Sequence, residues 1–191
     1  MNIILASQSP RRRELLGLFR FPFTVRVADI DEPMDPGALP QHEVARVSAL
    51  KANAIERGPE DLIIAADTIV VCDGQILGKP KDENDAFRML QLLSGRAHQV
   101  MTGMTVLYQD RAITHTEITH IHFRELSEAE IRSYIRTGDP MDKAGSYGIQ
   151  SGAALFADRL EGDYFNVVGL PVCRLGMLLK EIAPEILEES Q

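Results

Sequence analysis

The chain has 191 residues, of which 45% are hydrophobic and 25% are charged. These values are ordinary for a globular protein and supply enough apolar side chains for one substantial core. The formal net charge of -8 argues against nonspecific binding to nucleic acids or membranes, because both present anionic surfaces.

Hydrophobic periodicity predicts alternating strands and helices in the first half of the chain. In chain order, these are a strand at 3–6, a helix at 10–19, a strand at 23–27, an acidic and proline-rich loop at 29–40, a helix at 41–56, strands at 62–72 and 75–78, and a helix at 83–93. Asp73-Gly74, between the last two strands, is a strong two-residue hairpin turn.

The second half begins with two long predicted strands joined by a turn near Gln109-Asp110. The elements are strands at 99–107 and 112–123, a helix at 127–136, a polar loop at 139–152, one or two strands over 153–168, a helix at 171–182 and an acidic, frayed tail at 185–191. Together they predict an α/β fold, a mixed β-sheet flanked by helices. We expect one domain over 1–191, with the tail starting at about residue 184.

A basic first turn marks the first helix. Ser9 suits the N-cap and Pro10 the first helical position. Arg11, Arg12 and Arg13 then fall where the helix dipole is already positive. Unpaired amides and guanidinium groups at one place make an anion site, most naturally for phosphate. The alternative is that these arginines are solvated or pair with nearby acids.

Asp67 is a charged residue in the middle of an apolar strand. A carboxylate there must be paired, hydrogen-bonded, metal-bound or protonated, since an isolated buried charge is very costly. We favour a functional role for Asp67 over the alternative of a structural acid held by backbone amides.

Lys79 follows the returning strand, in Gly78-Lys79-Pro80. In a regular hairpin Cys72 faces Gln75, which puts Thr68 opposite Lys79 and points Asp67 to the other face. Lys79 and Asp67 can therefore converge only if the strand bulges or ends near Gly78. Otherwise Lys79 is a solvated lysine at a strand end.

Two further candidates are ambiguous on their own. Glu32 lies in a short acidic loop that is either solvated or a source of oxygen ligands for Mg²⁺. Lys51 lies on the second helix, where a surface lysine needs no explanation.

The segment 142–150 is the densest run of polar and glycine residues. Its glycines permit close backbone approach or unusual dihedral angles, and the amide of Gln150 could read a base edge. An ordinary surface loop is the competing interpretation.

The histidines and cysteines suggest no metal site or disulfide. His120 and His122 share one face of a predicted strand, but no further ligands cluster nearby, so we interpret them and His115 as exposed. Cys72 and Cys173 lie in apolar segments, without a disulfide framework or zinc spacing. No secretory signal or membrane-spanning run is present, which predicts a cytoplasmic protein.

In their order and spacing, several segments resemble the Maf family of nucleoside triphosphate pyrophosphatases nearly end to end. The motifs that carry the resemblance are Leu5-Ala6-Ser7-Gln8-Ser9-Pro10-Arg11-Arg12, the Glu32 loop, the Lys51 helix, Ala66-Asp67-Thr68, Gly78-Lys79-Pro80, Asp142-Lys143-Ala144-Gly145-Ser146-Tyr147-Gly148-Ile149-Gln150 and Val168-Gly169-Leu170-Pro171.

The resemblance implies two lobes around a deep cleft, a fold related to inosine triphosphate pyrophosphatases, and hydrolysis of a nucleoside triphosphate to monophosphate and pyrophosphate. It also implies a divalent metal (Mg²⁺ or Mn²⁺), a homodimer and house-cleaning of noncanonical nucleotides. Arg11, Thr68 and Gln150 match the dTTP/UTP branch. The alternatives are 7-methyl-GTP or another modified nucleotide as substrate, or a nucleotide-sensing regulator of septum formation. Ser151 departs from the family, where glycine is common, and we expect a local loop adjustment there.

The resemblance also assigns roles to residues. It makes Asp67 the proton acceptor; we add Glu32 and Asp67 as metal ligands. Arg12 and the amides from Ser7 to Ser9 are expected to hold phosphate oxygens, with Lys51 and Lys79 stabilising charge on the phosphates. The expected readers of the pyrimidine are Arg11, Thr68 and Gln150.

Overall fold

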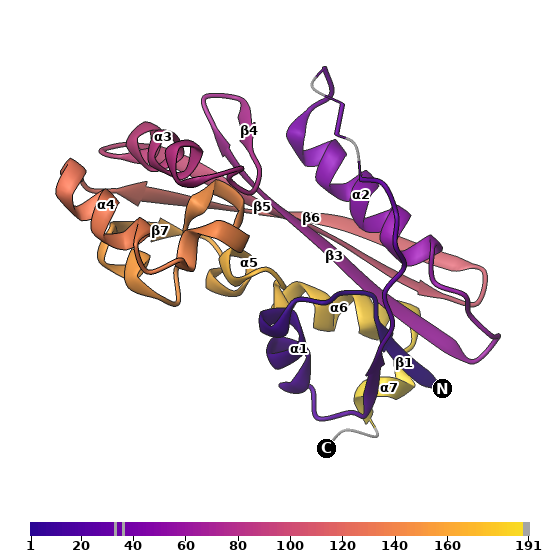
Figure 1. Ribbon diagram of the computed structural model, residues 1–191. Coiled ribbons are helices and arrows are strands. Elements are labelled where there is room, and N and C mark those ends of the chain that lie inside the picture. The colour runs from indigo at the N-terminus through magenta and orange to yellow at the C-terminus, as the bar shows by residue number, and fades with distance from the viewer. Residues whose placement is uncertain (33, 36, 189–191) are drawn as a thin grey trace. The chain divides into compact units, whose positions relative to one another are not determined.

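The computed structural model describes residues 1–32, 34–35 and 37–188. Pro33 and Pro36 of the acidic loop, and 189–191 of the acidic tail, lie outside the described residues. The strands are β1 (Asn2–Leu5), β2 (Phe23–Val25), β3 (Asp61–Cys72), β4 (Gln75–Leu77), β5 (Ala97–Tyr108), β6 (Arg111–Phe123) and β7 (Ala157–Glu161). The helices are α1 (Pro10–Gly17), α2 (Pro40–Asn53), α3 (Glu83–Leu93), α4 (Glu128–Ile135), α5 (Tyr164–Val168), α6 (Val172–Ile182) and α7 (Glu185–Glu188) (Figure 1).

The strands form one mixed sheet in the order β2-β1-β3-β5-β6-β7, with β4 paired to β3. Strand β1 runs parallel to both β2 and β3, whereas β3–β4 and β6–β7 are antiparallel. The predicted mixed α/β class is therefore confirmed. No helix within the described part of the chain combines the length and apolar character that crossing a membrane requires.

The chain divides into two compact units. The first unit comprises Met1–Asp67, Thr102–Glu117 and Gly169–Gln191, and the second comprises Thr68–Met101 and Ile118–Val168. Strands β3, β5 and β6 contribute residues to both units. Each unit is described by itself below, and the expectation of a single domain stays a prediction.

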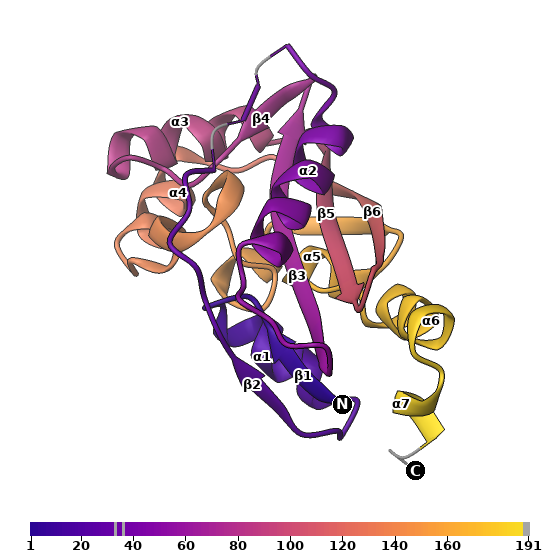
Figure 2. The ribbon, with the colours of Figure 1, turned by 90° about the vertical axis from the view of Figure 1, so that its right-hand side faces the viewer.

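In the first unit, helix α2 packs closely on the sheet, as Figure 2 shows. Ile63 and Ala65 of β3 form a buried cluster with Ala52 and Ile55, at and just beyond the end of α2. A Cβ atom at Gly103 of β5 would lie only 2.3 Å from the carbonyl oxygen of Val44 in α2, so glycine alone permits this approach. Side chains alternate along a strand, so Asp67 shares the α2 face with Ile63 and Ala65.

In the second unit, α3 and α4 cover a core rich in aromatic residues. Phe123 makes edge-to-face contacts with His98, Tyr147 and Phe156. The predicted hairpin turn is confirmed: Asp73 and Gly74 adopt φ angles of 50° and 78°, the left-handed values that a tight hairpin requires.

The region from 139 to 168 differs from the sequence prediction. The predicted loop contains three short 3₁₀ turns: η1 (Asp139–Asp142), η2 (Ala144–Ser146) and the start of η3 (Gly152–Leu155). The predicted strands over 153–168 are only partly correct, because β7 is followed by helix α5. The Asp163 carboxylate accepts hydrogen bonds from the amides of Phe165 and Asn166, which stabilises a helical turn where apolar composition indicated a strand.

The acidic tail also differs from expectation. It begins with the single helical turn of α7 over Glu185–Glu188, where fraying was predicted.

Candidate functional site

The first part of the candidate site is the start of α1 in the first unit. Ser9 caps the helix, and its hydroxyl accepts a hydrogen bond from the amide of Arg12, as predicted. The Arg12 guanidinium donates to the carbonyl oxygen of Gly169 at 2.8 Å and to the Ser7 hydroxyl at 3.2 Å. Arg12 is thus fixed by two groups that the sequence analysis did not connect to it.

Electrostatics link Arg12 to two carboxylates of the same unit. Burial lowers the pKa of the Arg12 guanidinium, and the negative charges of Asp67 and Glu32 act in the opposite direction. Arg12 remains a cation at neutral pH and interacts electrostatically with both acids that the sequence singled out.

Lys51 lies between these two carboxylates. Its ammonium nitrogen is 2.7 Å from Asp67 Oδ1 and 2.8 Å from Glu32 Oε2. The Lys51 side chain is only 18% exposed, and that of Asp67 is 12% exposed. The interpretation of Lys51 as an ordinary surface lysine is therefore wrong.

The fold explains why these residues meet. Asp67 points toward α2 because it shares a face of β3 with Ile63 and Ala65, and Lys51 lies in the last turn of that helix. The partner of Asp67 is consequently a lysine side chain, rather than the backbone amides of the structural alternative.

Lys79 and Thr68 belong to the second unit. Regular pairing of the hairpin ends at Val70 and Leu77, so β4 ends before Gly78, one of the two irregularities that the sequence analysis required. Lys79 is exposed and Thr68 is half-buried. Their predicted contacts with nucleotide stay predictions.

Gln150 is also exposed in the second unit, at the end of the glycine-rich segment. The segment is not an ordinary surface loop, because Gly145, Ser146 and Tyr147 are buried. The amide of Gly145 donates a hydrogen bond to the carbonyl oxygen of Gly78, so the segment is tied to the residue that precedes Lys79.

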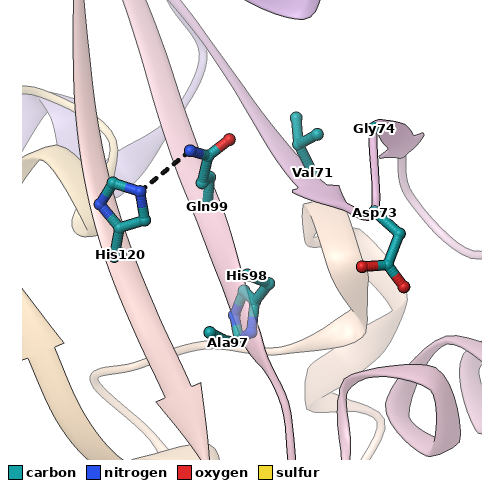
Figure 3. Close-up of a pocket in the computed structure, with 7 residues that line it drawn as sticks. All are labelled: Val71, Asp73, Gly74, Ala97, His98, Gln99 and His120. Atoms are coloured by element: carbon teal, nitrogen blue, oxygen red, sulfur yellow. Dashed lines mark hydrogen bonds between the residues drawn. The ribbon is translucent and has the colours of Figure 1, made fainter.

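A separate hollow lies in the second unit (Figure 3). Its lining residues are Val71, Asp73, Gly74, Ala97, His98, Gln99 and His120. His98 bonds to the hydroxyl of Tyr147, and burial lowers the pKa of its imidazole to about 4. No predicted site residue lines this hollow among the residues that the structure describes, so we do not assign it to the candidate site.

Three histidines of the long strands make local contacts; His120 is exposed as predicted, whereas His115 and His122 are half-buried. His115 contacts Glu117, His122 contacts Asp158, and His120 bonds to Gln99. Over residues 1–32, 34–35 and 37–188, no three histidine, cysteine or acidic side chains are grouped as a metal site.

The sequence analysis missed the part played by Gly169. Its φ angle is 120°, a conformation that L side chains rarely adopt, and its carbonyl oxygen anchors Arg12. The glycine before Leu-Pro in Val168-Gly169-Leu170-Pro171 is the available signal in the sequence. Nothing local linked it to an arginine 157 positions away.

Comparison with known proteins gives close relatives. Proteins named dTTP/UTP pyrophosphatase from Bacillus pumilus and Syntrophomonas wolfei are each 49% identical to this chain over 180 residues. The alignments cover 94% and 92% of this chain and 95% of each relative. A protein of the same name from Clostridioides difficile is 47% identical over 184 residues, covering 95% of both chains.

A solved structure also shares the fold. A HAM1 protein from Coxiella burnetii aligns with a TM-score of 0.53 at 13% identity, covering 95% of this chain and 99% of that one. A family model described as Maf-like protein matches residues 2–182. The resemblance stated from the motifs is thereby confirmed, and the chain belongs to the Maf family.

Proposed function

We propose that this chain hydrolyses dTTP and UTP to the nucleoside monophosphate and pyrophosphate. The observation that carries the proposal is the Lys51 ammonium held between the carboxylates of Asp67 and Glu32, beside Arg12. Two relatives that are named for this activity are 49% identical to the chain, and the alignments cover 95% of each. An acid set among cations suits a reaction in which a polyphosphate is bound and a proton is removed from water.

The carboxylates also suit a divalent metal. Glu32 and Asp67 direct hard oxygen donors at one point, which Lys51 now occupies. Mg²⁺ is commonly held by one or two carboxylates together with substrate phosphates, so a pair of acids is a sufficient protein contribution. Glu32 and Asp67 would hold Mg²⁺ or Mn²⁺, which when bound supplies positive charge to the phosphate oxygens.

The chain's own residues carry the rest of the mechanism. Asp67 accepts a proton from the water that attacks the α-phosphorus; the new P–O bond forms as the bond to the pyrophosphate oxygen breaks. Arg12 and the amides from Ser7 to Ser9 bind phosphate oxygens, and Lys51 and Lys79 stabilise the charge that builds on them. Positioning and charge neutralisation account for most of the rate in such transfers.

Base recognition is assigned to Arg11, Thr68 and Gln150. The Gln150 amide carries both a donor and an acceptor, and a pyrimidine with N3–H and O4 offers the complementary pair. A site that hydrogen-bonds a base rejects mismatched bases strongly, because the mismatch leaves polar groups unpaired.

The decisive experiment is a pyrophosphate-release assay on the purified chain. The panel comprises the natural triphosphates, 7-methyl-GTP and modified pyrimidines, each with Mg²⁺, Mn²⁺ or a chelator. We expect metal-dependent turnover with dTTP and UTP preferred. Preference for 7-methyl-GTP or a modified base would show that the substrate is not dTTP or UTP. Nucleotide binding without turnover would favour a nucleotide-sensing regulator of septum formation.

The remaining expectations concern the state of the protein in the cell. We propose a homodimer in the cytoplasm, one that removes noncanonical nucleotides and acts neither on nucleic acid nor at a membrane. Sedimentation of the purified chain tests the dimer, and fractionation of cells tests its location.

A further inference from the structure

A half-buried hydrogen-bond network in the second unit centres on Asp139. Its carboxylate accepts hydrogen bonds from the hydroxyls of Tyr134 and Ser151 and, at 3.0 Å, from the ammonium of Lys143. Lys143 also bonds to the backbone oxygen of Asp139 at 2.7 Å. None of these four residues has a role in the function proposed above.

The network holds the backbone of the segment that leads to Gln150. The amide of Gly148 donates to the Tyr134 hydroxyl at 3.0 Å, and the carbonyl oxygen of Gly148 is 2.9 Å from the Ser151 hydroxyl. The amide of Gly148 is therefore held two positions before Gln150, and the single Ser151 hydroxyl proton lies between the Asp139 carboxylate and the Gly148 carbonyl oxygen. The amide of Gly145 is bonded to Gly78 at 3.0 Å, which fixes the other end of the segment.

The backbone leaves this segment little freedom. Gly145 and Ser146 adopt φ angles of 69° and 61°, and Ser146 is fully buried. A Cβ atom at Gly148 would lie 2.7 Å from the Lys143 side chain. The conformation is uncommon for ordinary residues and needs surrounding contacts to hold it.

Electrostatics agree with a charged Asp139 at the centre. Burial raises the pKa of Asp139, but hydrogen bonds from Ser151, Tyr134 and Lys143 outweigh it, and the pKa lies below its usual value. Asp139 is therefore an anion at neutral pH, and hydrogen bonds to an ionised group are stronger than neutral ones.

We infer that Asp139 is a positioning residue for base recognition, and that Ser151 strengthens it in this chain. Gln150 itself is exposed, so the path of its backbone sets where its amide points. Discrimination by a hydrogen-bonding side chain requires that side chain to be placed to within about 0.5 Å. This inference rests on the proposed function, in which Gln150 reads the pyrimidine.

The network gives a physical role to Ser151, which stands where glycine is common in the family. A glycine would offer no hydroxyl to Asp139 or to the carbonyl of Gly148. Ser151 thus adds a tie between the residue after Gln150 and the centre of the network.

The test compares UTP with CTP, which differ only at the base edge, where donors and acceptors are exchanged. We would measure kcat and KM of the full chain and of Ser151→Gly and Asp139→Asn. We expect the ratio of kcat/KM for UTP over CTP to fall about threefold in Ser151→Gly and about tenfold in Asp139→Asn, mainly through KM for UTP.

A matched control removes a comparable carboxylate from the same unit. Glu130 accepts hydrogen bonds from Arg124 and Ser127 at the start of α4, and Glu130→Gln is expected to leave the UTP/CTP ratio unchanged. Hydrogen exchange in the absence of nucleotide adds an independent readout. Exchange of the Gly148 amide should accelerate in both test variants and not in the control.

The outcomes separate the two proposals. A wild-type chain that hydrolyses no pyrimidine triphosphate overturns the proposed function, and the base-reading role of Asp139 with it. An active wild type whose ratio is the same in Ser151→Gly overturns the positioning role alone, even if the Gly148 amide exchanges faster. Because Ser151→Gly removes only a small, half-buried side chain, it keeps the test valid if Asp139→Asn fails to fold.

Discussion

The two units hold their charged groups in opposite ways. In the first unit, Lys51 joins Asp67 to Glu32 by side chains alone, and the three residues come from a helix, a strand and a loop. In the second unit, Asp139 contacts residues close to it in sequence and fixes backbone, while Gln150 is left exposed.

The two units therefore preorganise binding groups in different ways, one through ion pairs between side chains and the other through hydrogen bonds to the backbone. A cluster of paired charges can exchange one cation for another without moving the chain, because the partners are side chains. A network that fixes backbone instead determines the direction of a side chain that it does not touch. The first arrangement suits phosphate chemistry, and the second suits discrimination between bases.

Asp67→Asn is expected to have the largest effect, because it removes the carboxylate at the centre of the first unit's charged cluster. We expect turnover to fall by about 10³-fold, the scale of a lost general base, with the fold and nucleotide binding retained. Pyrophosphate release and a nucleotide titration measure the two effects. The matched control is Asp61→Asn on the same strand: Asp61 bonds to Asn2 and the Gly58 amide, so its loss should reduce stability without abolishing turnover. Retained dTTP hydrolysis in Asp67→Asn would remove its role as base.

Lys51→Ala tests the pairing itself. It leaves two carboxylates facing each other and removes one positive charge from the phosphate region, so we expect kcat to fall about 10²-fold. Steady-state kinetics measure the loss, and Lys180→Ala, an exposed lysine of α6, is the control. A variant with wild-type kcat would show that the cluster serves stability alone.

His98 makes the stability of the second unit depend on pH. The folded imidazole has a pKa of about 4 because burial disfavours its charged form, whereas an unfolded histidine titrates near 6.5. Between these values the unfolded chain binds the extra proton, so stability falls as pH drops from about 6.5 to about 4, by at most about 3 kcal/mol.

His98→Gln keeps a polar atom for Tyr147 and abolishes that titration. Urea unfolding at pH 7 and pH 4.5 is expected to show a smaller loss on acidification for His98→Gln than for wild type. His42→Gln, at an exposed position, should follow wild type. Equal acid sensitivity in all three chains would contradict the assignment.

The smallest expected effect is on stability at acid pH, and it concerns one carboxylate from each unit, Glu43 and Glu130. Hydrogen bonds from Arg46 lower the pKa of Glu43 to about 2, and those from Arg124 lower that of Glu130 to about 2. Each contributes stability that is complete above the unfolded pKa, near 4.5, and is lost as pH falls toward 2. The difference in melting temperature between wild type and Glu43→Gln, or Glu130→Gln, should therefore shrink over that range. A difference that persists at pH 2 would point to packing instead of charge.

Local signals in the sequence were sufficient for much of the fold. The Ser9 cap and the Asp73-Gly74 turn each depend on residues a few positions apart, and both are present. Helix α5 was missed because distant contacts add to its local Asp163 cap: the side-chain amide of Asn166 donates to the Val100 carbonyl oxygen and the Thr119 hydroxyl, which lie 66 and 47 positions away.

In the candidate site too, local features could be predicted from the sequence and long-range contacts could not. Asp67 was identifiable because a carboxylate in an apolar strand is costly, but its partner could not be derived from the sequence. Lys51 is 16 positions away, and only the packing of α2 on β3 brings it within 2.7 Å. The Asp139 network escaped notice because its members are ordinary polar residues whose spacing matches no recognisable motif.

The close approach of α2 to β5 at Gly103 has a consequence for how this sequence can change. With a carbonyl oxygen 2.3 Å from where a methyl group would stand, every other amino acid forces the helix that carries Lys51 away from the strand beneath it. A library that randomises codon 103 should return glycine codons alone among functional clones. Codon 17, whose glycine has open space around it, should tolerate many replacements.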